Sequence, residues 1–407
     1  MNASAPALPL SEARQTRLIG VVATVHGVSH FYHLLLASMF PWLREAFGFS
    51  YAELGLLMTM FFVVSGIGQA TSGFLVDRIG ARPVLIVSLL AFTLSCLVLA
   101  TASSYAQLMA GAILAGLGNS TFHPVDFSIL NARIRNERLP RAYAMHGVFG
   151  SLGWALAPLL LTSVAALADW RAAYIAAMLP ALCGLALAVW AWGELEVSPM
   201  HSQGGPAGAR ASEPIAVSAL LRMPALWFSA LYFLSIALAL GAIQSFGTES
   251  VRLLRDLEPS HTGYLLSLFM VANALGTLAG GYVLRNPDGA ERVVTLSFAA
   301  AAVCALVIGL LPLSVWMVPV MFCLLGFASG VAGPARDMLV KRATPAGSSG
   351  RVYGLVYSAL DVGIAIAPSL FGLLMDAGLP VGIWVGVASA YGVLIASANL
   401  LGRSTRR

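Results

Sequence analysis

The sequence predicts an all-α membrane protein whose second half repeats the first. Of its 407 residues, 58% are hydrophobic and 10% are charged, whereas soluble domains carry about 25% charged residues. Identical residue types also recur at a constant spacing along the chain. The pairs that lie 210 residues apart include Gly116 and Gly326, Pro124 and Pro334, Arg141 and Arg351, Tyr143 and Tyr353, Gly153 and Gly363, and Pro158 and Pro368. A hydrophobic, duplicated chain of this size typically encloses a pathway between its two halves.

Apolar stretches predict twelve membrane-spanning helices, six in each repeat, because a helix needs about 20 apolar residues to cross a bilayer. The spans are expected near residues 18–40, 52–76, 83–102, 105–130, 142–164, 171–193, 224–248, 261–284, 293–311, 316–340, 352–374 and 380–401. The longest polar stretch, residues 194–222, is rich in Gly, Pro and Ser and predicts a flexible cytoplasmic linker. It separates an N-terminal six-helix half, residues 1–193, from a C-terminal half, residues 223–407.

The basic residues predict that both termini lie in the cytoplasm. With the N-terminus inside, 18 of the 23 Lys and Arg residues fall on the cytoplasmic side and four fall on the opposite side. The remaining one, Arg336, lies near the inner end of the tenth span. Because cytoplasmic loops are enriched in Lys and Arg, this distribution supports a cytoplasmic position for both termini. We expect a multi-pass protein of the bacterial cell (inner) membrane.

Several other function classes are disfavoured by the composition. The four cysteines lie singly in apolar stretches without a CxxC pair, which argues against a disulfide framework or a thiolate metal site. The basic residues behind the net charge of +5 lie in short loops, so we expect no nucleic-acid partner. No GxxxxGK[ST] pattern occurs, which argues against transport driven by ATP. No cofactor is indicated.

The loop between the second and third spans carries a recognisable motif, Gly73-Phe-Leu-Val-Asp77-Arg78-Ile-Gly80-Ala-Arg82-Pro83. Gly73 permits close helix approach, Asp77 can pair with arginine or cap a helix, and Gly80 permits a tight turn. In this position, the motif resembles that of the major facilitator superfamily, and the resemblance covers essentially the whole chain. It implies that superfamily's fold and a cytoplasmic latch between the halves, with the latch residues Gly73, Asp77, Arg78, Gly80 and Arg82. The alternative is a purely structural, arginine-rich anchor.

A further resemblance is to the fosmidomycin-resistance-type branch of that superfamily, whose members include drug–proton antiporters. It rests on His26 at the start of span 1, on Pro41 at its end and on Phe122-His123-Pro124 in span 4. The chain departs from this branch at His30, where an acidic residue is often found. The second copy of the latch loop also departs from its pattern, since Arg285 replaces the Asp.

Five of the seven histidines fall within predicted spans, and three of them share a helix face. His26, His30 and His33 are spaced i, i+4 and i+7, which places them within about 60° of one another on a helix. Since spans 1, 4, 7 and 10 line the central cavity in the resembled family, we expect a histidine ladder facing it. Such a ladder could relay protons, or it could ligate a substrate or a metal. The sequence does not identify which residues would bind a metal. The alternative is neutral histidines hydrogen-bonded to neighbouring helices.

Other ionisable residues extend the list of proton or substrate candidates. His123 and Asp126, at i and i+3 on span 4, could form a His–carboxylate pair, or only a satisfied polar pair at a kink. His146 is as compatible with an interfacial position as with one that lines the cavity. Arg336 could bind an anionic substrate group or pair locally, and Asp361 is unmatched in the first repeat, which suggests a task of its own.

The leading hypothesis is a proton-coupled secondary transporter and not an enzyme. It would move a small organic solute or drug by alternating access, as a monomer in the lipid bilayer, with protons as the coupling ion. A metal ion or metal chelate is the alternative cargo because of the histidine ladder. A membrane-embedded metalloenzyme or a receptor is the hypothesis of another class, disfavoured because the sequence offers no second ligand set and no signalling domain.

Overall fold

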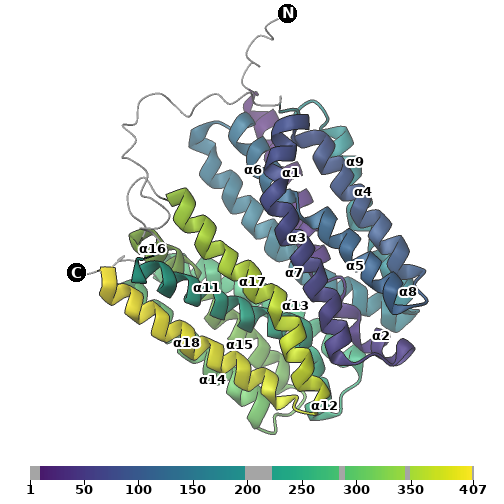
Figure 1. The fold of residues 1–407 in the computed structure, drawn as a ribbon, viewed down its shortest axis with the longest axis vertical. Coiled ribbons are helices and arrows are strands. Elements are labelled where there is room, and N and C mark those ends of the chain that lie inside the picture. Colours follow the sequence, from purple (N-terminus) through teal and green to yellow (C-terminus); the bar gives the residue numbers. More distant parts are fainter. Residues whose placement is uncertain (1–9, 198–221, 284–288, 344–348, 406–407) are drawn as a thin grey trace, which may run out of the picture. The chain divides into compact units, whose positions relative to one another are not determined.

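The computed structural model describes residues 10–197, 222–283, 289–343 and 349–405, and within these ranges the chain is helical without a strand (Figure 1). The helices of the first repeat are α1 (Glu12–His33), η1 (Ala37–Met39), α2 (Phe40–Phe47), α3 (Tyr51–Ile79), α4 (Ala81–Ala100), α5 (Tyr105–Asn119), α6 (Phe122–Arg133), η2 (Asn136–Arg138), α7 (Leu139–Leu167), α8 (Trp170–Ala176) and α9 (Met178–Trp190). Those of the second are α11 (Pro224–Ala242), the π-helical turn η3 (Ile243–Gly247), α12 (Thr248–Arg255), α13 (Pro259–Val283), α14 (Ala290–Leu310), α15 (Met317–Val331), α16 (Gly333–Ala343), α17 (Ser349–Asp376) and α18 (Val381–Thr405).

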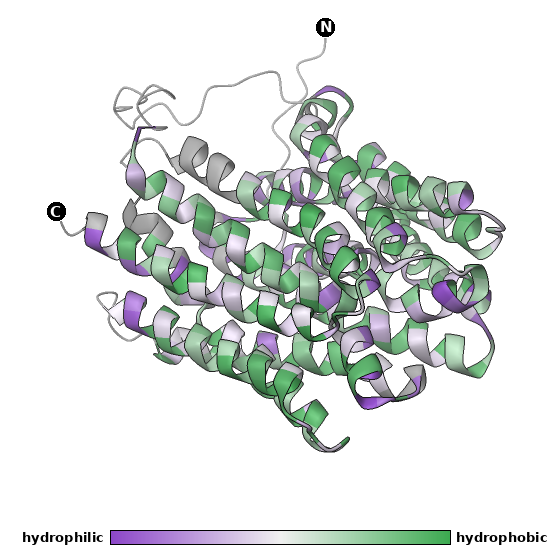
Figure 2. Ribbon diagram, turned by 60° about the horizontal axis from the view of Figure 1, so that its bottom comes forward, coloured by the Kyte–Doolittle hydropathy of each residue, from purple (hydrophilic) through white to green (hydrophobic). Residues whose placement is uncertain are grey.

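The described helices make the chain a multi-pass membrane protein. Ten of them are long and apolar enough to cross a bilayer, and an eleventh span results if Glu12–His33 and Ala37–Phe47, bent by 45°, are one span. Hydrophobic residues are the most frequent along these helices (Figure 2). The predicted span at 105–130 is divided into α5 and α6, each too short to count by itself. The total of twelve spans and the cytoplasmic termini therefore stay predictions.

The duplication is visible in the places where helices break. In the first repeat α5 ends at Asn119 and α6 begins at Phe122, whereas in the second α15 ends at Val331 and α16 begins at Gly333. Each new helix has a proline in its first turn, and proline cannot donate a hydrogen bond to the preceding turn. The matched prolines therefore account for the same interruption in both copies.

Contacts divide the chain into two compact units. Unit 1 comprises Met1–His33, Val64–Trp154 and Tyr174–Gln203, and unit 2 comprises Leu34–Val63, Ala155–Ala173 and Gly204–Arg407. Parts of the first repeat thus pack with the second repeat. Most of the predicted linker, residues 194–222, lies outside the described residues, so the division of the chain at that linker stays a prediction.

Within unit 1, glycines bring the backbones of α1 and α7 into direct contact. A Cβ atom on Gly153 would lie 2.0 Å from the carbonyl oxygen of Gly27, and one on Gly27 would lie 2.8 Å from that of Phe149. A Cβ on Gly150 would lie 2.8 Å from the ring of His30. The absence of side chains at these three positions therefore seats the histidines of α1 directly against α7.

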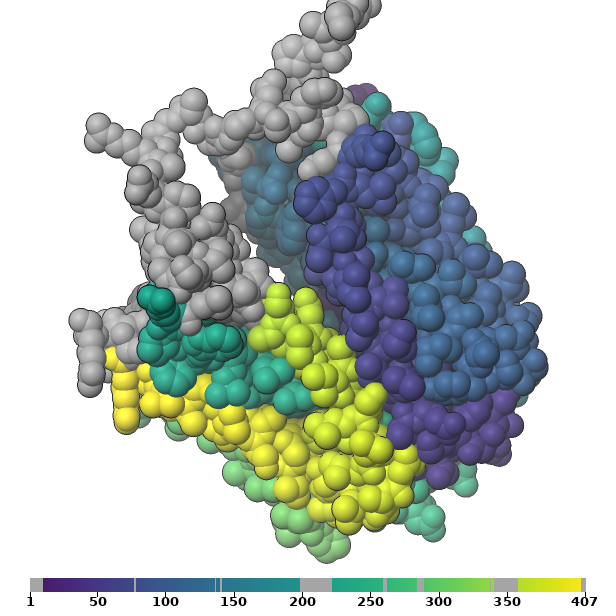
Figure 3. Space-filling view, in the orientation of Figure 1, coloured from purple at the N-terminus to yellow at the C-terminus, as the bar shows by residue number. Residues whose placement is uncertain are grey.

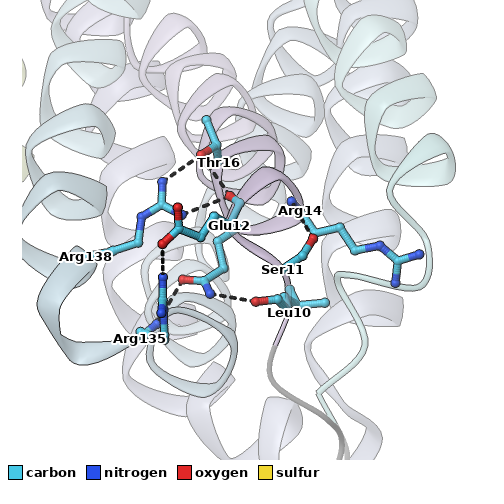
Figure 4. Close-up of polar contacts among 8 residues, drawn as sticks. Leu10, Ser11, Glu12, Arg14, Thr16, Arg135 and Arg138 are labelled. Atoms are coloured by element: carbon cyan, nitrogen blue, oxygen red, sulfur yellow. Dashed lines mark hydrogen bonds and ion pairs between the residues drawn. The ribbon is translucent and has the colours of Figure 1, made fainter.

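The N-terminal end of α1 is tied to the turn that follows α6 (Figure 4). The carboxylate of Glu12 accepts a hydrogen bond of 2.5 Å from the guanidinium of Arg135. Arg138 donates to the Glu12 carbonyl oxygen at 2.9 Å and to the Thr16 hydroxyl at 2.6 Å. The fully buried Gln15 accepts from the Arg135 backbone nitrogen at 3.2 Å. These contacts fix the two helices that carry most of the site.

Within unit 2, α11 lies beside both α17 and α18 (Figures 1 and 3). Gly363, the repeat partner of Gly153, plays the same part here, since its Cβ would lie 2.8 Å from the carbonyl oxygen of Leu234. The segment 34–63 also packs on α17, and a Cβ on Gly55 would lie 2.3 Å from the Pro368 carbonyl oxygen. Glycine therefore supports close helix packing in both units.

Candidate functional site

The centre of the candidate site is Asp126, a carboxylate on α6 that is 1% exposed. Its Oδ2 atom lies 3.0 Å from Nδ1 of His26 on α1 and 3.1 Å from Nε2 of His146 on α7. When Asp126 is ionised it only accepts hydrogen bonds, and both imidazoles then donate to this one oxygen. Three helices of unit 1 thus converge on a single buried carboxyl group.

The other histidines of unit 1 surround this trio. The rings of His26 and His146 are stacked with centroids 3.4 Å apart. The ring of His30 lies 4.4 Å from that of His26, and the ring of His123 lies 5.1 Å from it. His33 continues the series at 4.9 Å from His30. We call these five histidines and Asp126 the histidine cluster.

Hydrogen bonds hold His33 in its neutral form. The indole Nε1 of Trp154, which can only donate, lies 3.3 Å from Nδ1 of His33. That nitrogen must therefore accept and carry no proton. Its Nε2–H donates to Oδ1 of Asn119 at 3.1 Å, and Asn119 in turn donates to the Ser65 hydroxyl at 2.7 Å. His33 thus anchors this end of the cluster through hydrogen bonds to α5 and α7.

The histidine cluster also contains polar atoms without a hydrogen-bond partner among the described residues. They are Oδ1 of Asp126 and Nδ1 of His30, both buried. A buried polar atom left unpaired costs about 1–3 kcal/mol, so such atoms in a functional protein mark places where a proton or ligand can bind. The cluster therefore has both a buried charge and unused ligating capacity.

The three histidines of the predicted ladder lie next to one another, whereas the predicted His123–Asp126 pair shows no hydrogen bond among the described residues. That the ladder faces the central cavity stays a prediction. His26, His30 and His33 lie together on one face of α1, as their spacing predicts. Asp126, however, bonds to His26 and His146 on other helices and not to His123. The Nδ1–H group of His123 instead donates to Oε1 of Gln69 on α3 at 3.0 Å. Neighbouring helices therefore determine both pairings, and they override the i, i+3 relation.

His146 is the site residue that the sequence did not single out. It is 6% exposed and belongs to the histidine cluster through its contact with Asp126. The available signal was its place as a fifth histidine within a predicted span. Its partner Asp126 lies 20 residues earlier, on the preceding helix of the chain.

The predicted latch residues lie at the end of α3 and the start of α4. Gly80 has a φ of +87° and precedes α4, which confirms the tight turn expected there. No described atom lies within 4 Å of the place a Cβ on Gly73 would take, so the close helix approach expected at that glycine is not found. Arg78 is exposed, and the side chain of Asp77 lies outside the described residues.

Arg82, the last latch residue, contacts its own unit. Its guanidinium lies 4.1 Å above the Trp192 ring and donates at 3.3 Å to both the Trp192 carbonyl oxygen and the Glu196 carboxylate. Arg82 therefore contacts the residues that follow α9. A latch between the two six-helix halves stays a prediction.

The two candidates of the second repeat lie outside the histidine cluster. Arg336, on α16, is half-buried with its guanidinium 5.5 Å from the Phe233 ring centroid. Asp361 is exposed on α17. Both belong to unit 2, whereas the histidine cluster belongs to unit 1.

Unit 2 has a second buried carboxylate that the sequence did not single out as a site. Glu249 on α12 is 2% exposed and receives hydrogen bonds from the Tyr51 hydroxyl at 2.7 Å and from Arg252 at 2.7 and 2.8 Å. The nearby carboxylate of Asp376 accepts from the backbone nitrogens of Tyr51 and Ala52 at 2.7 and 2.8 Å. We call these five residues the Glu249 network. It joins the start of α3 to α12 and to the end of α17.

Comparison with known proteins gives several full-length relatives. The chain is 26% identical over 369 residues to the fosmidomycin resistance protein of Escherichia coli, covering 88% of this chain and 86% of that one. It is 24% identical over 350 residues to the class B tetracycline resistance protein of Escherichia coli, covering 84% of each. A probable 4-methylmuconolactone transporter of Cupriavidus pinatubonensis is 31% identical over 152 residues, but that match covers only 36% of either chain.

Solved structures share the fold. The bacterial homologue of the human lysosomal transporter Spinster, in an inward-facing and unoccupied conformation, aligns with a TM-score of 0.75 at 13% identity and covers 98% of both chains. Its occupied form aligns with a TM-score of 0.73 at 14% identity, covering 98% of this chain and 96% of that one. The sequence profile of the Major Facilitator Superfamily matches residues 22–257 and 244–406, which together span both repeats. The chain belongs to the Major Facilitator Superfamily and is a membrane transporter of small molecules, not an enzyme.

Proposed function

We propose that this protein is a proton-coupled secondary transporter in which Asp126, His26 and His146 carry the coupling proton. The single observation behind this proposal is the burial of Asp126 between two imidazoles, with no Lys or Arg of the described residues paired to it. Histidine can gain or lose a proton near physiological pH. A proton taken up by this trio changes the net charge at the point where α1, α6 and α7 meet.

The cost of the buried charge supports this role. An ionisable group at the bilayer centre costs about 2.5–3.5 kcal/mol on insertion scales, and such groups usually mark ion or proton pathways. Packing of α1 on α7 does not require a buried charge, since glycine contacts bring these two helices together. Proton binding and release at the trio would bias two conformations of the transporter, which is how a bound ligand drives alternating access.

The cargo in this proposal is a small organic solute or drug, moved across the inner membrane of a bacterium. The names of full-length relatives concern resistance to fosmidomycin and tetracycline, which is consistent with efflux. We further propose twelve spans, cytoplasmic termini and a monomeric transporter, following the charge distribution and the repeat. The latch residues and the candidates Arg336 and Asp361 would act in the conformational change and in cargo binding.

Reconstitution tests the proposal directly. A compound selected by a thermal-shift screen is loaded into proteoliposomes, and its flux is followed together with internal pH. The wild type should move protons and compound in a fixed ratio. Asp126→Asn should abolish this coupling, because the amide cannot take up a proton, and His30→Ala should also impair it through loss of the ring beside His26.

The matched control is Asn131→Asp, at an exposed residue of α6 outside the histidine cluster, which should leave coupled flux intact. All variants should elute as single species in size-exclusion chromatography, which excludes misfolding as the cause. Coupled flux that is unchanged in both Asp126→Asn and His30→Ala would refute a proton role for the cluster.

A further inference from the structure

We propose that the histidine cluster is also a binding site for a divalent transition-metal ion of the Zn²⁺, Co²⁺ or Ni²⁺ type, with His26, Asp126 and His146 as its ligands. The ligand atoms of these three residues all lie within 4.8 Å of one another, and all three side chains are buried. The inference concerns the same residues as the proposed proton site, but it does not depend on proton coupling.

The spacing of the ligand atoms suits a tetrahedral ion. Zinc bonds to histidine nitrogen and carboxylate oxygen are about 2.0–2.2 Å long, so neighbouring ligand atoms in a tetrahedral site lie about 3.3 Å apart. The two observed separations from Asp126 Oδ2 are 3.0 Å to His26 and 3.1 Å to His146. An ion therefore needs only small side-chain shifts to replace the two hydrogen bonds with metal–ligand bonds.

Charge favours this trio over a second histidine trio in the same cluster. His26, His30 and His123 also bring their ring nitrogens within 4.8 Å. Three neutral imidazoles, however, leave a dication uncompensated inside the membrane, where an unpaired charge is costly. Asp126 supplies one negative charge at the first trio, and its Oδ1 atom, which has no hydrogen-bond partner among the described residues, is a further ligand atom. The ion is therefore expected at Asp126.

The donor set determines the class of metal. Imidazole nitrogen suits zinc, copper, cobalt and nickel, whereas calcium and magnesium require several oxygen ligands. The trio provides two nitrogens and one carboxylate group, which excludes a good calcium or magnesium site. Three protein ligands leave the fourth position to water or to an exchangeable group, as in open zinc sites. Such a site can exchange its ion.

The test measures metal binding on the full-length protein purified in detergent, with any affinity tag removed. Equilibrium dialysis against Zn²⁺, followed by elemental analysis, should give about one tightly bound ion per chain. Bound Co²⁺ should show the intense visible absorption of a tetrahedral nitrogen and oxygen site. Because the ligands come from three helices, Zn²⁺ should also raise the unfolding temperature of the wild type.

Variants identify the ligands. Asp126→Asn and His146→Ala should each weaken Zn²⁺ binding by more than about tenfold, since even the loss of an outer-shell partner costs about 10–100-fold. His123→Ala should keep binding within about tenfold, and His201→Ala, in the predicted linker, provides the matched histidine control. Each variant is first shown to be monodisperse, and His146→Gln replaces His146→Ala if the alanine variant does not fold.

Two outcomes overturn the inference. The first is no Zn²⁺ bound above the level of the His26→Ala variant. The second is binding that survives His146→Ala but is lost in His123→Ala, which would place the ion at the uncharged trio. The result is separable from proton coupling, because metal binding is read without any flux and coupled flux is read without added metal.

Discussion

Two buried carboxylates, Asp126 in unit 1 and Glu249 in unit 2, have opposite kinds of partner. Glu249 is held by Arg252, which is always charged, and by the Tyr51 hydroxyl. Among the described residues, Asp126 is hydrogen-bonded only to His26 and His146, whose imidazoles, unlike a guanidinium, can be either neutral or protonated. The negative charge of Glu249 is therefore always balanced by Arg252, whereas that of Asp126 is balanced only when one of its histidines is protonated. This difference indicates a structural connection at Glu249 and a proton or ligand site at Asp126.

The same division appears when equivalent positions of the two repeats are compared. Glycines that allow close helix contact are kept, as Gly153 and Gly363 show. Position 126, by contrast, is Asp in the first repeat and Arg336 in the second, and position 123 is His in the first and Gly333 in the second. The helix packing at these glycines is therefore common to both repeats, whereas the histidine cluster belongs to the first.

The largest expected effect on stability comes from removing one hydrogen-bonding partner of each carboxylate, Arg252 of Glu249 and His146 of Asp126. Arg252→Met leaves Glu249 buried with the Tyr51 hydroxyl but without its cation, and breaking a buried ion pair costs about 3–5 kcal/mol. Because Arg252 is 25% exposed and Tyr51 still donates, we expect the lower end, about 3 kcal/mol. His146→Leu should cost less, about 1–2 kcal/mol, since His26 still donates to Asp126. Unfolding in detergent at neutral pH measures both. Equal losses would contradict the proposed difference between the two sites.

Glycine substitutions on α7 test the frame that positions the histidine cluster. Gly153→Ala places a methyl group 2.0 Å from the Gly27 carbonyl oxygen, and such overpacking costs about 1–3 kcal/mol. Gly147 lies on the same helix with no described atom within 4 Å of its Cβ position. Gly147→Ala should therefore be neutral or stabilise by up to about 1 kcal/mol. If both variants have the same free energy of unfolding, close contact between α1 and α7 does not determine the position of the histidines.

The sequence predicted the helices and the histidine ladder because both depend on local periodicity. Hydropathy locates a span, and the spacing of His26, His30 and His33 places them on one face. Pairing between helices is not local. The face of a helix does not identify its neighbour, so neither the Asp126–His146 bond nor the Tyr51–Glu249 bond, which joins residues 198 positions apart, followed from spacing. The break between α5 and α6 was missed because apolar composition continues through it.

Tyr51→Phe tests the Glu249 network more gently. The change removes the hydroxyl that donates to Glu249 at 2.7 Å and keeps the ring, over which the Arg44 guanidinium lies at 4.3 Å. A hydrogen bond to a charged group contributes about 1.5–3 kcal/mol, and Arg252 still pairs with Glu249, so we expect a loss of about 1.5 kcal/mol. Tyr282→Phe, at a tyrosine that is 83% exposed, is the matched control. A loss no larger than in that control would show that the hydroxyl contributes nothing.

The smallest expected effect separates His33 from the rest of the histidine cluster. Trp154→Phe removes the Nε1–H group that donates to His33 Nδ1 at 3.3 Å while the aromatic ring beside His30 remains. The loss of one long neutral hydrogen bond should lower the free energy of unfolding by about 0.5–1 kcal/mol. The more telling readout is the His33 imidazole in nitrogen-15 NMR spectra. In the wild type Nδ1 accepts the indole hydrogen bond and Nε2–H donates to Asn119, so the change should shift the Nδ1 resonance and leave the Nε2 resonance close to its original position. An Nδ1 resonance that is the same in both proteins would show that the indole does not donate to His33.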